Sequence, residues 1–262
     1  MRKFGFKLYS DNLKNAPDLI KECAEFSSSV SDAFIELMVM PDSTMDDLRI
    51  IKKQIGDVEV RIHAPHDGMG FDPGNKDLEE QNRKLVSLSQ KAADLFDAKT
   101  MVVHAGLGYG QAYIDETVRQ FKLFNDSRII VENLPYLDNG IQPMHGSTAD
   151  EVLYIMRETG CGFCFDFSHA ICTALTLHMD IDKQLKSLFE LKPSVYHISD
   201  GYIDKDIDLH LFLGSGTFPL AHLINDFTTK DAYITIETGV GKLFHADLKI
   251  KDYYYLKSLQ NI

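Results

Sequence analysis

The chain contains no tryptophan and only four cysteines among its 262 residues, and its 27 basic residues are outnumbered by 39 acidic ones. The formal net charge of −12 leaves no overall basic surface, so non-specific affinity for a polyanion is expected to be poor. No apolar run approaches the roughly 18 residues of a membrane span, and the N-terminal MRKFGFKLYS lacks an apolar signal core. These absences predict a soluble, cytoplasmic protein without a membrane partner.

The four cysteines are expected to remain thiols, because a chain without an export signal meets reducing conditions. Cys161 and Cys164 form a CxxC motif, but they open an apolar, strand-like run. Redox motifs of this kind usually open a helix after a strand. Burial in the core therefore explains this motif better than redox chemistry does.

Short β-like runs alternate with amphipathic helical stretches along the chain, which indicates βαβ units and a parallel sheet. Eight strands are predicted, at residues 4–9, 33–40, 58–66, 100–106, 128–134, 162–169, 194–199 and 232–239. Eight strand–helix units are what an α/β protein of the (β/α)8 TIM barrel type requires. Because no linker, low-complexity tract or repeat divides the chain, we predict one barrel domain over residues 1–262.

The stretch PYLDNGIQPMHGS, residues 135–147, is the longest connection between predicted elements. A loop of this length is either a lid or substrate-contacting loop, or a surface excursion without a role. The predicted loop DGMGFDPGN, residues 67–75, is also long enough to reach over a site.

Imidazoles and carboxylates gather at the ends of the predicted strands, where TIM barrels carry their active sites. They are His66, His104, Glu132, Asp166, His169, His197, Asp208, His210 and Glu237. Any one of these histidines alone is readily explained as a hydrogen-bonded core residue, but the set is not. Burying so many ionisable groups without compensating cations is costly. Because such ligands suit zinc, manganese or iron, we predict a metal site at the barrel mouth.

The order of motifs along the chain resembles the xylose isomerase-like barrel superfamily, and the full set resembles endonuclease IV, the family that cleaves DNA at abasic sites. The motifs are PHD at 65–67, His104, VEN at 131–133, DxxH at 166–169, His197, DxH with LGSG at 208–216, and IET at 236–238. The resemblance covers the chain from the third predicted strand to the eighth.

This resemblance implies a cluster of up to three Zn²⁺ ions, with Mn²⁺ as the alternative. Glu132 would bridge two metals, of which one is also held by His66 and His104. The set that would hold the second metal comprises Glu132, Asp166, His197 and Glu237, and the set for the third comprises His169, Asp208 and His210. Such a cluster implies hydrolysis of DNA at abasic sites without a protein nucleophile.

The sequence departs from the nuclease pattern in two places. It has DFSHAICTALT where that family has a stretch resembling DTCHAFAAGYD, and it lacks an aromatic residue soon after PHD. Met69 or Phe71 could act as a wedge between bases, although packing within the loop explains them equally well. The candidate phosphate contacts are Lys14, Lys76, Lys205 and Lys242. Because acidic residues outnumber them, a weak grip on a phosphate backbone is expected.

A sugar or sugar-phosphate isomerase or epimerase is the alternative that the same superfamily implies. Such an enzyme would hold one metal with the four-residue set containing Glu132, and it would use Glu132 and Glu237 as its catalytic acid/base pair. A small sugar pocket lined by Phe6, Tyr9 and Phe71 fits this alternative. A non-catalytic scaffold is a third possibility, and retention of all nine ligands disfavours it.

Several other residues have simpler expected roles. Glu36 and His63 are candidates to support the ligands from behind, with structural burial as the equal alternative. Four histidines outside the set, His145, His178, His222 and His245, are expected to be solvated. Gly214 and Gly216 are expected to permit a tight turn.

Overall fold

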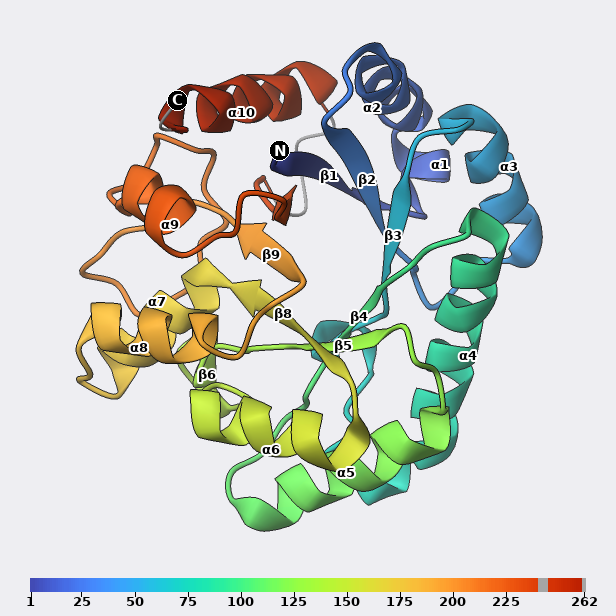
Figure 1. Cartoon of the computed structure of the whole chain (residues 1–262). Helices are drawn as coiled ribbons and strands as arrows, with labels where there is room; N and C mark the ends of the chain where they lie inside the picture. The colour runs from blue at the N-terminus through green and yellow to red at the C-terminus, as the bar shows by residue number, and fades with distance from the viewer. Residues whose placement is uncertain (240–244, 261–262) are drawn as a thin grey trace.

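Eight parallel strands close into a barrel in the order β1-β10-β9-β8-β5-β4-β3-β2 (Figure 1). They are β1 (Lys3–Tyr9), β2 (Ala33–Met38), β3 (Val60–His63), β4 (Met101–His104), β5 (Ile129–Glu132), β8 (Gly162–Asp166), β9 (Val195–Ile198) and β10 (Tyr233–Ile236). The structure is a computed structural model, and it describes residues 1–239 and 245–260. The predicted (β/α)8 TIM barrel is confirmed.

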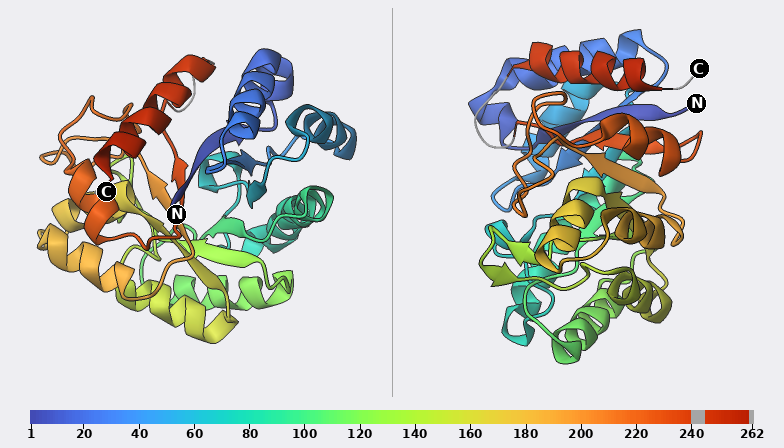
Figure 2. Two further views of the ribbon diagram at one scale, coloured as in Figure 1. Left: turned by 45° about the horizontal axis from the view of Figure 1, so that its top comes forward. Right: turned by 90° about the vertical axis from the view of Figure 1, so that its left-hand side faces the viewer.

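A ring of helices surrounds the barrel, and α10 packs between α2 and α9 (Figure 2). The α-helices are α1 (Asn12–Asn15), α2 (Pro17–Ser29), α3 (Met45–Ile55), α4 (Glu79–Phe96), α5 (Gln111–Phe124), α6 (Ala149–Thr159), α7 (Phe167–Thr176), α8 (Ile181–Phe189), α9 (Leu220–Asp226) and α10 (Ala246–Leu259). Two short 3-10 helices, η1 (Asp67–Met69) and η2 (Lys76–Leu78), follow β3. Within the described residues, no helix has the length and apolar character needed to cross a bilayer.

Several observed strands are shorter than predicted, β3 ending at His63 rather than at His66, and two further differences concern the site. The sixth predicted strand ends at Asp166, and His169 lies in α7, because the Asp166 carboxylate accepts a hydrogen bond from the His169 backbone N–H at 2.7 Å and caps the helix. The long loop at 135–147 contains a small antiparallel hairpin of β6 (Leu137–Asp138) and β7 (Gln142–Pro143).

The barrel interior changes from apolar to ionisable along its axis. At the N-terminal end, Val102, Ile130, Cys164 and Val195 pack together, with Tyr233 against them. Closer to the C-terminal ends of the strands, the inward positions are ionisable: Lys7 on β1, Glu36 on β2 and His197 on β9. Because alternate residues of a strand share a face, the ionisable groups stand above an apolar floor.

The four cysteines are unpaired in the described structure. All four are free thiols; Cys23, Cys164 and Cys172 are buried and Cys161 is half-buried. Burial raises the pKa of Cys23 to about 12, so this thiol stays protonated and unreactive.

The loop after β9 is closed by one buried carboxylate, that of Asp200. Its Oδ1 accepts hydrogen bonds from the backbone N–H groups of Gly201 at 2.8 Å and Phe218 at 3.2 Å. Its Oδ2 accepts from Gly214 and Gly216, each at 2.9 Å. A side chain at Gly216 would overlap the Gly201 carbonyl, which explains the second glycine of LGSG. Asp200 therefore holds the ends of the loop that carries Asp208 and His210.

Replacing Asp200 by alanine is expected to lower the free energy of unfolding by about 3 kcal/mol, because four backbone donors lose a charged acceptor. Urea unfolding followed by circular dichroism measures this change. Asp204→Ala, at an exposed site in the same loop, is the matched control and should stay within about 0.5 kcal/mol of the parent. Equal stability of the two variants would contradict this role.

Candidate metal centre

The nine predicted ligands meet at the C-terminal mouth of the barrel, in groups whose potential ligand atoms lie within 4.8 Å of one another. One group is Glu132, Asp166, His197 and Glu237, and another is His169, Asp208 and His210. These two correspond to sets implied by the sequence resemblance.

The remaining predicted set is arranged differently around His104. His66 groups with Asp67 and His104, whereas His63 groups with His104 and Glu132. A further group joins Glu36, His63 and His197 below the mouth. Asp67 therefore belongs to the cluster although the sequence reasoning did not select it, and its place in the PHD motif was the available signal.

Strand register brings several of these residues together. His104 is the register partner of Glu132 on the neighbouring strands β4 and β5, and Asp166 is the partner of His197 on β8 and β9. Glu237 follows the last residue of β10, and its backbone N–H donates to the Ile198 carbonyl at 2.9 Å. The closed parallel barrel thus converts strand ends that are distant in sequence into one site.

Five histidines share one arrangement, in which one ring nitrogen contacts an oxygen acceptor and the other faces a carboxylate of the cluster. The first contacts are His63 Nδ1 to the Ala64 carbonyl, His104 Nδ1 to Asp67, His169 Nδ1 to the Asn133 carbonyl, His197 Nε2 to Glu36 and His210 Nδ1 to the Glu237 carbonyl. The second nitrogens face Glu132 in His63, His104 and His197, and face Asp208 in His169 and His210.

This arrangement specifies where each imidazole can accept a cation. Carbonyl and carboxylate oxygens accept hydrogen bonds but do not donate them, so the outer nitrogen of each ring carries the N–H. In a neutral imidazole the inner nitrogen then presents its lone pair to another acceptor. A proton or a metal ion between the two acceptors removes this conflict, and outer acceptors of this kind are typical of metal-bound histidines.

Two buried carboxylate oxygens, Asp208 Oδ2 and Glu237 Oε2, have histidine ring nitrogens as their neighbouring polar atoms. His210 Nε2 lies 2.9 Å from the first, and His197 Nδ1 lies 2.9 Å from the second. A desolvated anionic oxygen beside a ring nitrogen is satisfied only when a proton or a cation lies between them, and a divalent cation suits both the oxygens and the ring nitrogens as ligands. The residues present therefore fit a cluster of divalent cations.

Protons occupy part of this cluster when metal is absent. Burial disfavours the charged imidazoles, but hydrogen bonds with Asp67 and Glu132 raise the pKa of His104 to about 9, and the Asp208 charge raises the pKa of His210 to about 9. Burial and the nearby charge of Lys7 lower the pKa of His63 to about 4, so this ring is neutral at pH 7. Burial, with the charges of nearby carboxylates, raises the pKa of Asp166 to about 6.

Metal binding is therefore expected to release protons. At pH 7 the metal-free protein holds protons on His104 and His210, whose pKa values lie near 9, and a metal must displace them. Burial also disfavours the charged forms of His169 and His197, but the charge of Asp166 raises the pKa of His169, and Cys164 with Glu36 raises that of His197, so these rings hold protons too. We therefore expect at least two protons released per cluster, and an apparent Zn²⁺ affinity that rises from pH 7 to pH 9. Titration calorimetry in buffers with different ionisation enthalpies counts these protons. A binding enthalpy independent of the buffer would contradict this expectation.

A pocket of about 230 Å³ opens at the cluster. Its lining comprises Tyr9, Met38, His66, Asp67, His104, Glu132, Leu134, Pro135, Leu137, Asp138, Asn139, Met144, His169, Asp208, His210 and Glu237. The β6–β7 hairpin contributes Leu137 and Asp138, so the long loop contacts the site, as one of its two predicted alternatives required.

No lysine or arginine among the described residues lines this pocket. Lys14 lies 3.8 Å from Asp47, Lys76 lines a surface groove beside α4, and the Lys205 ammonium lies over the Tyr202 ring. The fourth candidate phosphate contact, Lys242, lies outside the described residues. Negative charge in a substrate would therefore depend on metal ions for compensation.

The structure decides between the two roles considered for Phe71. This side chain is fully buried and packs against Phe124, so it has the packing role and cannot act as a wedge, whereas Met69 is half-buried. Phe6 is also fully buried, against Phe26 on the outside of the barrel, so of the three aromatic residues expected in a sugar pocket only Tyr9 lines it.

The expectation that His145 is solvated is wrong. His145 is buried, since the loop at 135–147 packs against α5, and its Nε2 lies 2.7 Å from the Thr117 hydroxyl. The packing of loop against helix that buries His145 leaves no pattern in the local sequence.

One charged residue in the barrel was not selected from the sequence. Lys7 on β1 is 1% exposed, and its Nζ lies 2.8 Å from Glu36 Oε1 and 3.1 Å from Glu237 Oε1. Although burial disfavours the charged lysine, the Glu237 and Glu36 carboxylates raise its pKa above the usual value. Its only sequence signal is its inward position in the alternating run KFGFKLY.

Comparisons with known proteins agree with this architecture. Residues 30–252 match the family model described as xylose isomerase-like TIM barrel. A search of curated proteins finds no match. Among solved structures, a D-tagatose 3-epimerase-like protein is 16% identical with a TM-score of 0.70, covering 98% of this chain and 96% of its own.

Two solved structures from Thermus thermophilus are also similar. Its endonuclease IV is 18% identical with a TM-score of 0.67, covering 98% of each chain. A second protein, described as soaked with ZnCl2, is 14% identical with a TM-score of 0.69, covering 98% of this chain and 97% of its own. At these identities the likeness concerns the fold.

Proposed function

Because the chain belongs to the xylose isomerase-like TIM barrel family, we propose that it is a metal-dependent enzyme that hydrolyses phosphodiesters at the barrel mouth. The observation that carries the proposal is the group of His169, Asp208 and His210, which stands beside the four-residue group containing Glu132. A one-metal isomerase needs only the four-residue group. A second complete group favours a multinuclear site, which suits phosphodiester cleavage.

Glu132 contacts residues of two ligand groups, one containing His197 and the other containing His104. Its Oε1 lies 2.9 Å from His197 Nδ1, and its Oε2 lies 3.3 Å from His104 Nε2. The two oxygens of one buried carboxylate thus face two neighbouring groups, which is the geometry that a bridging ligand needs. Divalent cations held by these groups would acidify a water molecule and neutralise the charge that develops on a phosphate and its leaving oxygen.

The protein's own residues would hold and orient the cations and exclude bulk water. Glu237 lines the pocket, and its Oε2 lies 2.9 Å from His197 Nδ1, so this carboxylate can bind a cation together with that ring or accept a proton from water. His169 is fixed by the Asn133 carbonyl at 2.8 Å, and His210 by the Glu237 carbonyl at 2.9 Å. This anchoring holds the ring nitrogens in place before substrate arrives.

DNA containing an abasic site is the substrate that we propose to test first. The similarity to the Thermus endonuclease IV supports this choice, and the nine residues of the ordered motif set support it further. Because the described pocket lining holds no lysine or arginine, binding should depend on the metals more than on protein charges. Zn²⁺ is the metal proposed, with Mn²⁺ as the alternative.

The test is incision of a labelled duplex with one abasic site by protein loaded with Zn²⁺ or Mn²⁺, at low salt. Cleavage of this duplex, and not of the undamaged one, supports the proposal. Bis(p-nitrophenyl) phosphate serves as a minimal phosphodiester that needs no DNA-binding surface. Failure of the loaded protein to cleave either substrate would overturn the proposal.

A sugar or sugar-phosphate isomerase or epimerase is the second candidate. The small pocket favours it, as does the completeness of the group of Glu132, Asp166, His197 and Glu237. In this case Glu132 and Glu237 would move a proton at the carbon beside a carbonyl group. Incubation of ketohexoses with loaded protein in ²H₂O, followed by NMR, detects this exchange. Exchange without phosphodiester cleavage would select this candidate.

A further inference from the structure

A buried ion pair supports the cluster from below, where β1 and β2 run side by side. Lys7 and Glu36 are register partners on these strands, and their side chains are 1% and 0% exposed. The Lys7 Nζ donates to Glu36 Oε1 at 2.8 Å, so one oxygen of Glu36 is committed to the lysine.

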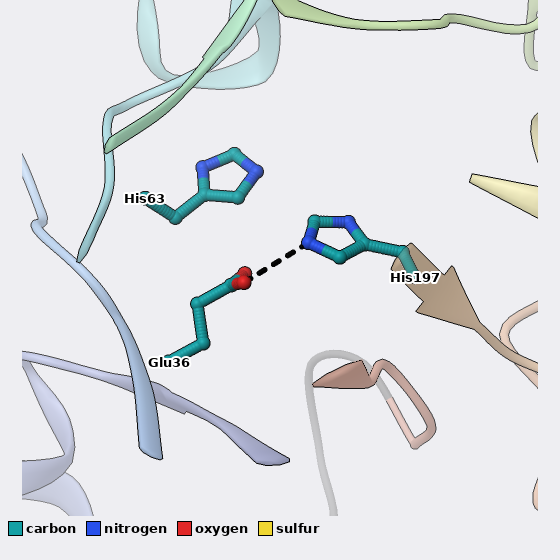
Figure 3. Close-up of side chains that lie close together, drawn as sticks. All are labelled: Glu36, His63 and His197. Atoms are coloured by element: carbon teal, nitrogen blue, oxygen red, sulfur yellow. Dashed lines mark hydrogen bonds and ion pairs between the residues drawn. The ribbon is translucent and has the colours of Figure 1, made fainter. Parts of the chain in front are cut away.

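The other oxygen of Glu36 faces the ligand histidine His197. His197 Nε2 lies 3.0 Å from Glu36 Oε2, and the Thr235 hydroxyl donates to the same oxygen at 2.8 Å. Figure 3 shows the Glu36 carboxylate directed at His197 across the interior of the barrel, with His63 above Glu36 in this view. These contacts leave Glu36 well satisfied and its position fixed.

We propose that Glu36, held by Lys7, is a positioning residue that orients His197 for metal binding. Glu36 accepts a hydrogen bond from His197 Nε2–H, so Nε2 keeps its proton and Nδ1 is the ring nitrogen left to bind a metal ion. Nδ1 lies 2.9 Å from both Glu132 and Glu237, which belong to the same ligand group. The inference rests on the metal centre of the proposed function, but not on which substrate is used.

A metal ion between Glu36, His63 and His197 is the competing interpretation of this contact. These residues do form a group with suitable spacing. However, the Lys7 ammonium already lies 2.8 Å from Glu36, and a second cation there would meet its charge in a site without solvent. The His63 Nδ1 is also committed to the Ala64 carbonyl, and its Nε2 faces Glu132. The positioning role therefore fits the contacts better.

Besides Glu36, Lys7 contacts a predicted metal ligand, Glu237. Its Nζ lies 3.1 Å from Glu237 Oε1, while Glu237 Oε2 faces His197. One buried cation thus contacts both the carboxylate that orients His197 and a carboxylate of the four-residue group. Loss of the pair is expected to affect this group and to leave the group of His169, Asp208 and His210 intact.

The test compares two variants that differ only in the acceptor offered to His197. Lys7→Met/Glu36→Leu replaces the ion pair by apolar side chains of similar size, a change that folded proteins often tolerate. Lys7→Met/Glu36→Gln restores a neutral oxygen acceptor. Lys3→Met/Glu59→Leu removes a lysine–glutamate pair, 2.6 Å apart and one-third exposed, at the other end of the barrel, and is the control for loss of such a pair away from the cluster.

Zn²⁺ affinity is measured by competition with a chromogenic chelator, on proteins whose folding is checked by circular dichroism. The leucine variant should bind one equivalent about 10-fold to 100-fold more weakly than the parent. The glutamine variant should recover much of this loss, and the control should match the parent. Equal binding by the leucine variant and the parent, or by the leucine and glutamine variants, would overturn the inference. Absence of Zn²⁺ binding by the parent would instead overturn the metal centre itself.

Discussion

Glu132→Gln is expected to reduce phosphodiester cleavage by about a thousandfold, or about 4 kcal/mol in activation free energy. The two oxygens of Glu132 face different groups, at 2.9 Å from His197 and 3.3 Å from His104. The amide has no negative charge and offers only one oxygen, so it cannot bridge two cations. Steady-state cleavage of the abasic duplex and of bis(p-nitrophenyl) phosphate measures the loss.

Metal content and circular dichroism of the same variant show whether the lost activity comes from a lost metal ion or from unfolding. Glu132→Gln should retain the parent's far-ultraviolet circular dichroism and lose at least one equivalent of Zn²⁺. Glu59→Gln, at the N-terminal end of the barrel, is the matched control and should retain both activity and metal. Activity of Glu132→Gln within about tenfold of the parent would rule out a bridging role.

His210→Asn is expected to have the second largest effect and to distinguish the two candidate enzymes. His210 belongs to the group with His169 and Asp208, which a one-metal isomerase does not need. We expect loss of one metal equivalent and about a hundredfold slower phosphodiester cleavage, or about 2.7 kcal/mol. Cleavage kinetics and metal analysis of the purified variant measure both effects.

A matched histidine supplies the control for this substitution. His222 contacts Asp182 and Asp226 on the outside of the barrel, so His222→Asn should leave cleavage and metal content unchanged. If His210→Asn abolishes neither cleavage nor metal binding, the third group has no part in the chemistry. If sugar isomerisation is found and survives in His210→Asn, the isomerase becomes the better account.

The barrel could be predicted because each strand is local in sequence and its ends are marked by turn-forming residues. Strand ends meet in a closed parallel barrel, so His104, Glu132 and Asp166 could be placed together without any structure. The end of the sixth strand could not be predicted in this way, because the Asp166 side chain caps a helix that begins before His169, inside the predicted strand. Capping depends on a rotamer, which the strand pattern does not specify.

Pairwise contacts across the barrel could not be predicted in the same way. Lys7 and Glu36 are 29 residues apart, and only their register across β1 and β2 makes them a buried ion pair. The burial of Phe71 and His145 likewise depends on loops that fold back over α5, against Phe124 and Thr117. Loop packing of this kind is a tertiary effect without a periodic sequence signal.

The most direct test of the multinuclear metal centre is the number of metal ions that the protein holds. Protein loaded with Zn²⁺, freed of excess by gel filtration and analysed by native mass spectrometry, should carry about three ions per chain. One ion is expected at the four-residue group containing Glu132, one at the group of His169, Asp208 and His210, and one beside His104, which two overlapping groups share. Retention of a single ion per chain, unchanged in His210→Asn, would contradict the multinuclear site and the phosphodiesterase proposed from it.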